Sequence, residues 1–228
     1  LIKLDTNFWE IGPGPSGPDT EIFYDRGEKY DKQKRGISML QNEEENDRYI
    51  EIWNNVLSQF NATEGLSREE YPELPHKNID TGMGVERMAC ILQETETNYE
   101  TDLFMPIMHK IEEICNIPYN GQMQFKVIAD HIRTLTFALS DGAVFENVGR
   151  GYVLRRLLRR ASRMGRKLNI NKEFLSPLVD VVVDNYKEVY PELVGTMPKV
   201  KELISKEELL FQKTLLSGEK KLEELFKN

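Results

Sequence analysis

The hydrophobic spacing of this 228-residue chain changes near residue 96, and that change limits the fold more than any single motif does. Before residue 96, strand-like runs alternate with turn-rich stretches. The strand-like runs are 7–11, 21–25 and 48–54, the last of which continues to residue 60. The stretch richest in proline and glycine is 13–18. After it, apolar residues recur with a helical period; the helices we predict are 101–115, 123–140, 150–168, 171–189 and 197–227. The sequence therefore predicts an α+β fold, with an antiparallel sheet in 1–95 followed by an all-helical domain in 96–228.

Two stretches within the first 95 residues do not follow the strand pattern. Residues 27–47 are polar and charged, and we interpret them as a surface insertion to which we assign no chemistry. Residues 83–93 have helical spacing, and Gly82 and Gly84 stand where a strand would turn into that helix.

Composition excludes some classes of protein. No stretch has the unbroken apolar length of a membrane span, so we predict no membrane partner. The cysteines, Cys90 and Cys115, have neither CxxC spacing nor histidine neighbours, which favours no disulfide framework, no zinc site and a reducing cytoplasm. Because the chain starts at Leu1 without a methionine or a leader, we expect it to be part of a longer protein.

One predicted helix is strongly basic. Residues 150–167 contain eight cationic side chains and no acidic one, although the chain has a net charge of −8. Successive residues of an α-helix are rotated by about 100° around its axis, and on such a helix most of these cations fall within an arc of roughly 140°. They are Arg155, Arg156, Arg159, Arg160, Arg163, Arg166 and Lys167, with Leu154, Leu157, Leu158, Ala161, Met164 and Leu168 on the opposite side.

Guanidinium groups bind phosphates bidentately, so a single-sign stripe of this kind predicts a nucleic-acid contact helix. The alternative is a solvated face, but such faces usually place carboxylates four residues from the basic groups.

A second candidate site is the segment Asp80-Thr-Gly-Met-Gly-Val-Glu-Arg87. Glycines allow a ligand close to the backbone, and a helix N-terminus favours an anion. Arg87 is suited to a phosphate and Asp80 to an ammonium. By itself a GxGxxR pattern is weak and favours an ordinary strand-to-helix turn with a solvated arginine.

Several ordered segments resemble a known family. Gly82-Met-Gly-Val-Glu-Arg87 is similar to motif 3 of class II aminoacyl-tRNA synthetases. Further segments resemble the alanyl-tRNA synthetase family: Asn7-Phe-Trp-Glu-Ile-Gly12, Glu21-Ile-Phe-Tyr-Asp25, Ile52-Trp-Asn54, Ala129-Asp-His-Ile-Arg133 and Asn147-Val-Gly-Arg-Gly-Tyr-Val-Leu-Arg-Arg156. The similarity covers almost the whole chain. It implies the C-terminal part of a class II catalytic domain in 1–95 and a helical tRNA-recognition domain in 96–228.

The resemblance implies ATP-dependent activation of alanine and its transfer to alanine tRNA, with ATP as a substrate and Mg²⁺ neutralising phosphate charge. The implied alanine-binding residues are Trp9, Asn54, Val56, Asp80 and Gly82, and the implied ATP-binding residues are Gly84 and Arg87. Glu51 and Asn54 are candidate metal or ATP contacts. A class II synthetase works by positioning and electrostatics, so no catalytic nucleophile or general base is expected. Without the resemblance, the sequence favours structural roles, with Trp9 as a core aromatic and Asn54 as a sheet-edge amide.

In the helical part, the resemblance assigns Asn147 to the G·U wobble pair of the alanine tRNA acceptor stem. The remaining implied tRNA-binding residues are Arg150, Arg155, Arg156, Arg159, Arg160 and Arg163. A second interpretation of Asn147 is that it caps the helix beginning near Gly149, as asparagine does well. For His131 we expect a structural role.

The chain also departs from the family pattern. Ser16 and Asp19 replace two family cysteines, and motifs 1 and 2 are absent. The resemblance implies that four further features belong C-terminal to this chain: the acidic partner of Asn147 in wobble recognition, the editing domain, its zinc, and the region through which the full-length protein would oligomerise. We therefore expect no aminoacylation by the chain alone.

Two other interpretations stay open. A non-enzymatic RNA-binding helical module would bind stems without preference for G·U, and a dimerisation fragment using the amphipathic terminal helix would associate without RNA affinity.

Overall fold

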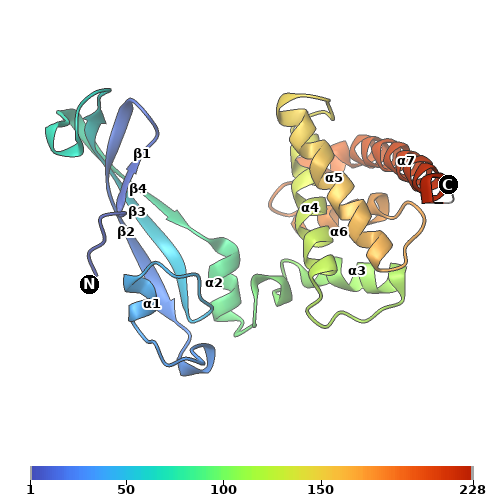
Figure 1. The fold of residues 1–228 in the computed structure, drawn as a ribbon, viewed down its shortest axis with the longest axis horizontal. Coiled ribbons are helices and arrows are strands. Elements are labelled where there is room, and N and C mark those ends of the chain that lie inside the picture. The colour runs from blue at the N-terminus through green and yellow to red at the C-terminus, as the bar shows by residue number, and fades with distance from the viewer. Residues whose placement is uncertain (1, 227–228) are drawn as a thin grey trace. The chain divides into compact units, whose positions relative to one another are not determined.

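The computed structural model describes residues 2–226, and the chain divides into two compact units, residues 1–98 and 99–228 (Figure 1). The first unit contains a four-stranded antiparallel sheet and the second is helical, which confirms the predicted α+β class. The strands are β1 (Phe8–Glu10), β2 (Gly14–Asp25), β3 (Tyr49–Ala62) and β4 (Glu73–Met83). Helix α2 (Val85–Leu92) follows β4 directly, after the glycines that predicted this turn.

The sheet has the order β1-β2-β3-β4, and the register of β2 against β3 slips twice, between Ser16 and Asp19 and again between Ile22 and Phe23. Ser16 pairs with Phe60 and Asp19 with Val56, so three β3 residues, 57–59, stand opposite two β2 residues, 17 and 18. A Cβ on Gly17 would lie 2.1 Å from the carbonyl oxygen of Leu57. Only glycine therefore permits the two backbones to approach at this bulge.

The predicted surface insertion has structure of its own. It contains η1 (Glu28–Tyr30) and α1 (Ser38–Gln41), and Met39 is buried beneath it. The carboxylate of Asp31 accepts backbone N–H groups from Gly36 and Arg35, which lower its pKa. Asp31 and Asp25 also accept hydrogen bonds from Arg48 at 3.2 Å and 2.8 Å, which fastens the segment to the sheet.

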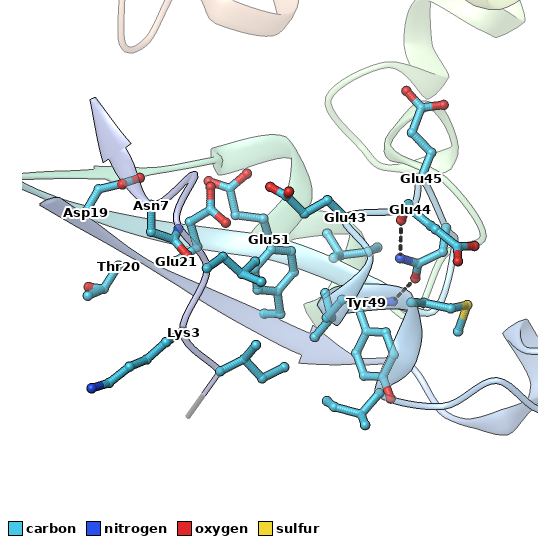
Figure 2. A pocket seen from close by; sticks show the side chains of 18 of the residues that line it. Lys3, Asn7, Asp19, Thr20, Glu21, Glu43, Glu44, Glu45, Tyr49 and Glu51 are labelled. Atoms are coloured by element: carbon cyan, nitrogen blue, oxygen red, sulfur yellow. Dashed lines mark hydrogen bonds between the residues drawn. The ribbon is translucent and has the colours of Figure 1, made fainter. Parts of the chain in front are cut away.

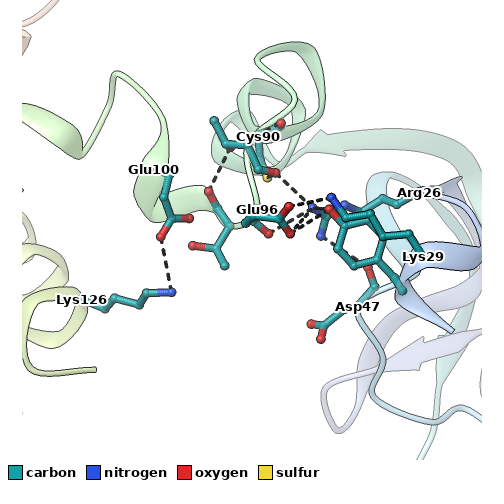
Figure 3. A network of polar contacts seen from close by, with 10 residues as sticks. Arg26, Lys29, Asp47, Cys90, Glu96, Glu100 and Lys126 are labelled. Atoms are coloured by element: carbon teal, nitrogen blue, oxygen red, sulfur yellow. Dashed lines mark hydrogen bonds and ion pairs between the residues drawn. The ribbon is translucent and has the colours of Figure 1, made fainter. Parts of the chain in front are cut away.

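The end of β2 is tied to the chain after α2. Figure 3 shows Arg26 reaching into this network, where its Nη2 donates to the hydroxyl of Tyr30 at 2.6 Å and to the carbonyl of Thr95 at 3.0 Å. Lys29 pairs with Glu96 at 2.6 Å. Polar contacts thus close the sheet unit, in which the buried apolar residues are Met39, Ala62 and Cys90.

The helical unit has an extensive apolar core. Its helices are α3 (Met105–Cys115), α4 (Met123–Ser140), α5 (Gly149–Lys167), α6 (Leu175–Tyr186) and α7 (Glu192–Phe226), preceded by η3 (Asn98–Glu100). Leu158 and Ala161 of α5 are fully buried, and Leu154, Leu157 and Met164 pack against the same core, which confirms the predicted apolar face. Each fully buried large side chain contributes about 1.5–3 kcal/mol, so this unit has the core it needs to fold.

Some predicted boundaries were wrong. Residues 14–18 belong to strand β2 rather than to a turn, and the strand expected before the helix at 83–93, whose start was not predicted, is β4. Helix α6 begins at Leu175 instead of 171, and α7 begins at Glu192 and contains Pro198. The predicted end of the last helix, 227, lies outside the described residues. Within residues 2–226, we find no helix that combines the length and the hydropathy of a membrane span.

Candidate active site and nucleic-acid interface

The predicted alanine-binding residues of the sheet share one face. Residues directly opposite each other in an antiparallel sheet point the same way, and so do residues two apart on one strand. The register places Asp19, Val56 and Asp80 in one row across β2, β3 and β4, and Glu21, Asn54 and Gly82 in the next row. The sheet thereby brings four of the five predicted alanine-binding residues together with Asp19 and Glu21.

Asn54 and Asp19 form a half-buried polar pair in these rows. The side-chain amide of Asn54 donates from Nδ2 to Asp19 Oδ2 at 3.2 Å. The other two oxygens, Asn54 Oδ1 and Asp19 Oδ1, are shielded from solvent and have no hydrogen-bond donor. Buried acceptors without a donor are costly, so this pair is suited to a ligand that brings N–H groups. Because β3 pairs on both sides, Asn54 is not a sheet-edge amide.

Trp9 is held at the bulge. It lies opposite Gly17 in the β1–β2 register and is half-buried, and its indole N–H donates to the carbonyl oxygen of Leu57 at 2.9 Å. The missing Cβ of Gly17 leaves this carbonyl room beside β2. Trp9 is therefore a fixed, half-buried aromatic opposite Gly17, two residues before Asp19 on β2, rather than a core aromatic.

Arg87 on the first turn of α2 is oriented by β3. Its Nη1 donates to the backbone carbonyl of Glu51 at 2.9 Å and to the Glu51 carboxylate at 2.8 Å. Gly84 is the N-cap of α2, and a Cβ there would lie 3.2 Å from Arg87 Cδ, so glycine lets the arginine lie against the turn. A Cβ on Gly82 would meet nothing within 4 Å, which means that this position borders open space.

An open cavity of about 1340 Å³ lies beside Arg87 and Glu51. Most of the charged residues in its lining are acidic, and Figure 2 shows the carboxylates of Glu21, Glu43 and Glu51 gathered on one side while Lys3 is directed away. Of the predicted site residues, Arg87 and Glu51 belong to this lining. The residues Trp9, Asn54, Val56, Asp80, Gly82 and Gly84 lie outside it. Sequence reasoning missed Asp19, Glu21 and Glu43 as site candidates. The acidic run 41–46 could have indicated such a site, but nothing in the sequence shows that this run lies beside the sheet.

The acidic residues influence one another. Burial raises the pKa of Glu21, and the nearby charges of Glu51 and Asp19 raise it further. Carboxylates that repel one another in this way are suited to a cation. Within the described part of the chain no three His, Cys, Asp or Glu residues are arranged to hold a metal ion by themselves. A metal here would need further ligands from a bound molecule.

The basic helix α5 presents its cations as two ridges. Arg156, Arg160, Arg163 and Lys167 follow the spacing i, i+4, i+7, i+11, and all four are exposed. Arg155, Arg159 and Arg166 form the adjacent ridge and are half-buried. Arg150, in the first turn, is exposed as well. The predicted single stripe is therefore divided.

The half-buried ridge faces an acid on α7. Glu207 is buried, and its Oε1 lies 2.9 Å from Arg155 Nε and 3.4 Å from Arg159 Nη2. The Arg159 guanidinium also lies 5.4 Å from the ring centroid of Phe211. The opposite charge that the α5 sequence lacks is thus supplied from the last helix.

Asn147 does not cap α5. The N-cap residue is Val148, and no side chain caps the helix. Instead, Asn147 is exposed and its Oδ1 accepts a hydrogen bond from Arg155 Nη1. A Cβ on Gly151 would lie 2.5 Å from the carbonyl oxygen of Val144, so this glycine lets the segment before α5 fold back over the first turn. His131 is buried beside Asp130, with Nδ1 2.9 Å from the carboxylate, in keeping with a structural role.

Comparisons with known proteins identify the family of this chain. The family model described as tRNA synthetases class II (A) matches residues 1–228. An alanine–tRNA ligase of Lactococcus lactis subsp. cremoris is 55% identical over 231 residues, covering 100% of this chain and 26% of the relative. That of Acholeplasma laidlawii is 56% identical over 222 residues, covering 97% of this chain and 26% of the relative. The chain spans about a quarter of the length of these relatives. It belongs to the class II (A) family of tRNA synthetases.

Proposed function

We propose that this chain serves an alanine–tRNA ligase, with residues 1–95 binding alanine and ATP and residues 96–228 binding the acceptor stem of alanine tRNA. The observation that carries the proposal is the pair of rows that puts Asp19, Asn54, Val56, Asp80 and Gly82 on one face of the sheet. The 55% identity to a protein named alanine–tRNA ligase supports the choice of amino acid. Because the product serves translation, we assign the protein to the cytoplasm.

In the proposed reaction, the carboxylate of alanine attacks the α-phosphate of ATP, forming alanyl-adenylate and releasing pyrophosphate. A ribose hydroxyl at the end of the tRNA then takes the alanyl group and AMP leaves. Asp80 binds the α-ammonium, and the donor-free oxygens of Asn54 and Asp19 accept its remaining N–H groups. Arg87 binds phosphate oxygens. These residues position the reactants and balance their charge, and none acts as a nucleophile.

Magnesium fits the donors beside Arg87. Mg²⁺ prefers oxygen ligands and is commonly held by one or two carboxylates together with substrate phosphates. Glu51 and Glu21 would supply those carboxylates, which agrees with the like-charge repulsion that raises the Glu21 pKa. The bound ion would neutralise phosphate charge.

Replacing Asp80 tests the amino-acid site. Asp80→Asn should raise the KM for alanine about 50-fold in the full-length protein that carries this chain, because the ammonium loses its ionic partner. Alanine-dependent exchange of pyrophosphate into ATP measures this, and the KM for ATP should change little. Glu73→Gln makes the same charge change at the far end of β4, where Glu73 pairs with Lys77, and should leave both constants unchanged. An unchanged KM for alanine in Asp80→Asn would refute the assignment.

Replacing two cations of the exposed ridge tests the RNA-binding face. Arg160→Gln with Arg163→Gln should weaken binding to an acceptor-stem hairpin about 30-fold at low salt, equally for G·U and G·C stems. The slope of affinity against salt should fall by about 2, because two phosphate contacts are lost. Fluorescence anisotropy at several salt concentrations measures both quantities.

The matched control is Lys187→Gln with Lys206→Gln, which removes the same charge from exposed lysines that pair with acids of their own segments. It should lower affinity only slightly. An equal loss in the control would mean that net charge, rather than the α5 ridge, binds RNA.

A further inference from the structure

Three residues from separate parts of the helical unit form a continuous polar chain. Glu207 of α7 contacts Arg155 of α5 at 2.9 Å, and Arg155 donates to the side-chain oxygen of Asn147, eight residues earlier. Glu207 is only 5% exposed, whereas Asn147 is exposed. The chain therefore runs from the interior of the unit to its surface.

The chemistry of Arg155 determines which end of the Asn147 amide faces outward. A guanidinium group has donors and no acceptor, so only the amide oxygen of Asn147 can bind it. The amide nitrogen, with its two N–H groups, is then the end that remains for a ligand. The buried carboxylate of Glu207 in turn holds the arginine by its charge, since it lies 2.9 Å from Arg155 Nε as an ion pair in a place largely shielded from solvent.

We infer that Glu207 is a positioning residue for base recognition: through Arg155 it holds Asn147 so that the amide N–H groups face an acceptor on a base edge of the bound RNA. The inference rests on the proposed binding of an acceptor stem. It also gives the two ridges of α5 different tasks. Arg155 and Arg159 serve the fold and the placement of Asn147, while Arg156, Arg160, Arg163 and Lys167 bind phosphates.

A base-edge acceptor is accessible from this position. The minor groove of an A-form helix is wide and shallow, and it exposes base edges to a side chain that reaches in from the surface. Phosphate contacts fix the register of the protein on the stem, whereas contacts with bases carry the specificity. Loss of Glu207 should therefore change specificity in a way that loss of a phosphate contact does not.

The test compares two hairpins, one with the G·U pair and one with G·C, bound to the unmodified chain and to Glu207→Gln. We expect Glu207→Gln to lose about tenfold in its preference for G·U, the size of one base-edge contact. Its affinity for the G·C stem should stay equal or rise, because the variant removes a negative charge near α5. Glu207→Asp, which keeps the charge, should recover part of the preference.

The matched control is Glu202→Gln, which removes an exposed carboxylate of the same helix that pairs with Lys206. It should leave the preference for G·U unchanged. A melting curve for each variant shows whether the helical unit is folded. Asn147→Ala should lose the same preference for G·U. The double variant Asn147→Ala, Glu207→Gln should show no further loss of that preference, since both residues act through one contact.

The outcomes separate this inference from the proposed function. Absence of binding to either hairpin would overturn the acceptor-stem proposal itself. Salt-sensitive binding with equal affinities for the two stems, or a preference for G·U that Glu207→Gln retains, would overturn the positioning role and leave the RNA-binding face intact.

Discussion

Gly165→Ala is expected to lower the unfolding free energy of the helical unit by about 2–3 kcal/mol, the upper part of the range for overpacked cores. A Cβ at this position of α5 would lie 2.3 Å from Cε1 and 2.4 Å from Cζ of Phe174. Phe174 is 2% exposed and belongs to the apolar core, so its ring has no free space to enter. Urea unfolding followed by the helical circular dichroism signal measures the change.

A second substitution identifies the cause. Phe174→Leu removes the ring atoms that the new methyl group would overlap, so the double variant Gly165→Ala, Phe174→Leu should lose less stability than the two single variants together. Gly195→Ala is the control and should not lower the unfolding free energy. A Cβ on this α7 residue would meet nothing within 4 Å, and alanine favours a helix over glycine by about 1 kcal/mol. Strict additivity of the two single changes would exclude the overlap as the cause.

The stability of the helical unit should fall by about 3 kcal/mol between pH 4.5 and pH 7 because of Glu208 alone. This carboxyl group is fully buried on α7 and accepts backbone N–H groups of Phe174 and Leu175, at the start of α6, at 3.2 Å and 3.0 Å. Burial raises its pKa to about 7. The folded protein therefore keeps a proton that the unfolded chain releases at about pH 4.5.

The sign follows from the proton count. Where the folded state binds more protons than the unfolded state, the unfolding free energy decreases as pH rises. The contribution is complete below about pH 4.5 and is lost as pH rises through 7. Glu208→Gln keeps an oxygen for the two N–H groups but cannot ionise, so its stability should not show this decrease.

Urea unfolding at several pH values measures the unfolding free energy of the unmodified chain and of Glu208→Gln. Because the two proteins share all other titrating groups, the contributions of those groups cancel in the difference. Glu202→Gln is the control, because Lys206 lowers the pKa of Glu202, and stability from that pair is lost only as pH falls. Parallel curves for the unmodified chain and Glu208→Gln would contradict the prediction.

The sequence predicted the elements whose signals are local. The spacing of apolar residues predicted α4 at its observed bounds and α5 to within one residue, because each buries one continuous face. The end of α3 was also predicted correctly, but its start was placed four residues too early. The start of α6 was wrong by four residues because Glu208, more than 30 residues later, supplies the acceptor for its first N–H groups. No local pattern contains that contact.

The strand β2 illustrates a different failure. Pro15, Gly17 and Pro18 are strong turn signals, and they outweigh any strand propensity in a short window. In the structure they occupy the bulged end of β2, where the register slips and the neighbouring backbone needs the space of a missing Cβ. The signal was real, but it indicated a close approach of two strands rather than a turn.

The sequence predicted individual residues of the candidate site, but the residues that lie beside them became known only from the pairing of the strands. Resemblance identified Asp80, Asn54 and Arg87, but only the register shows that Asp19 lies in the same row as Asp80 and contacts Asn54. Likewise, the sequence of α5 predicted a free stripe, and only the packing of α7 shows that two of its arginines are neutralised.

The register slip between Ser16 and Asp19 limits how this sequence can change during evolution. Side chains along a strand alternate between faces, so one inserted or deleted residue between positions 16 and 19 would turn Asp19 and Glu21 to the opposite side of the sheet. Substitutions at the same positions leave that alternation intact. Descendants of this chain should therefore vary in the identity of residues 16 and 19 far more readily than in the number of residues between Trp9 and Glu21, and alignment gaps should accumulate elsewhere.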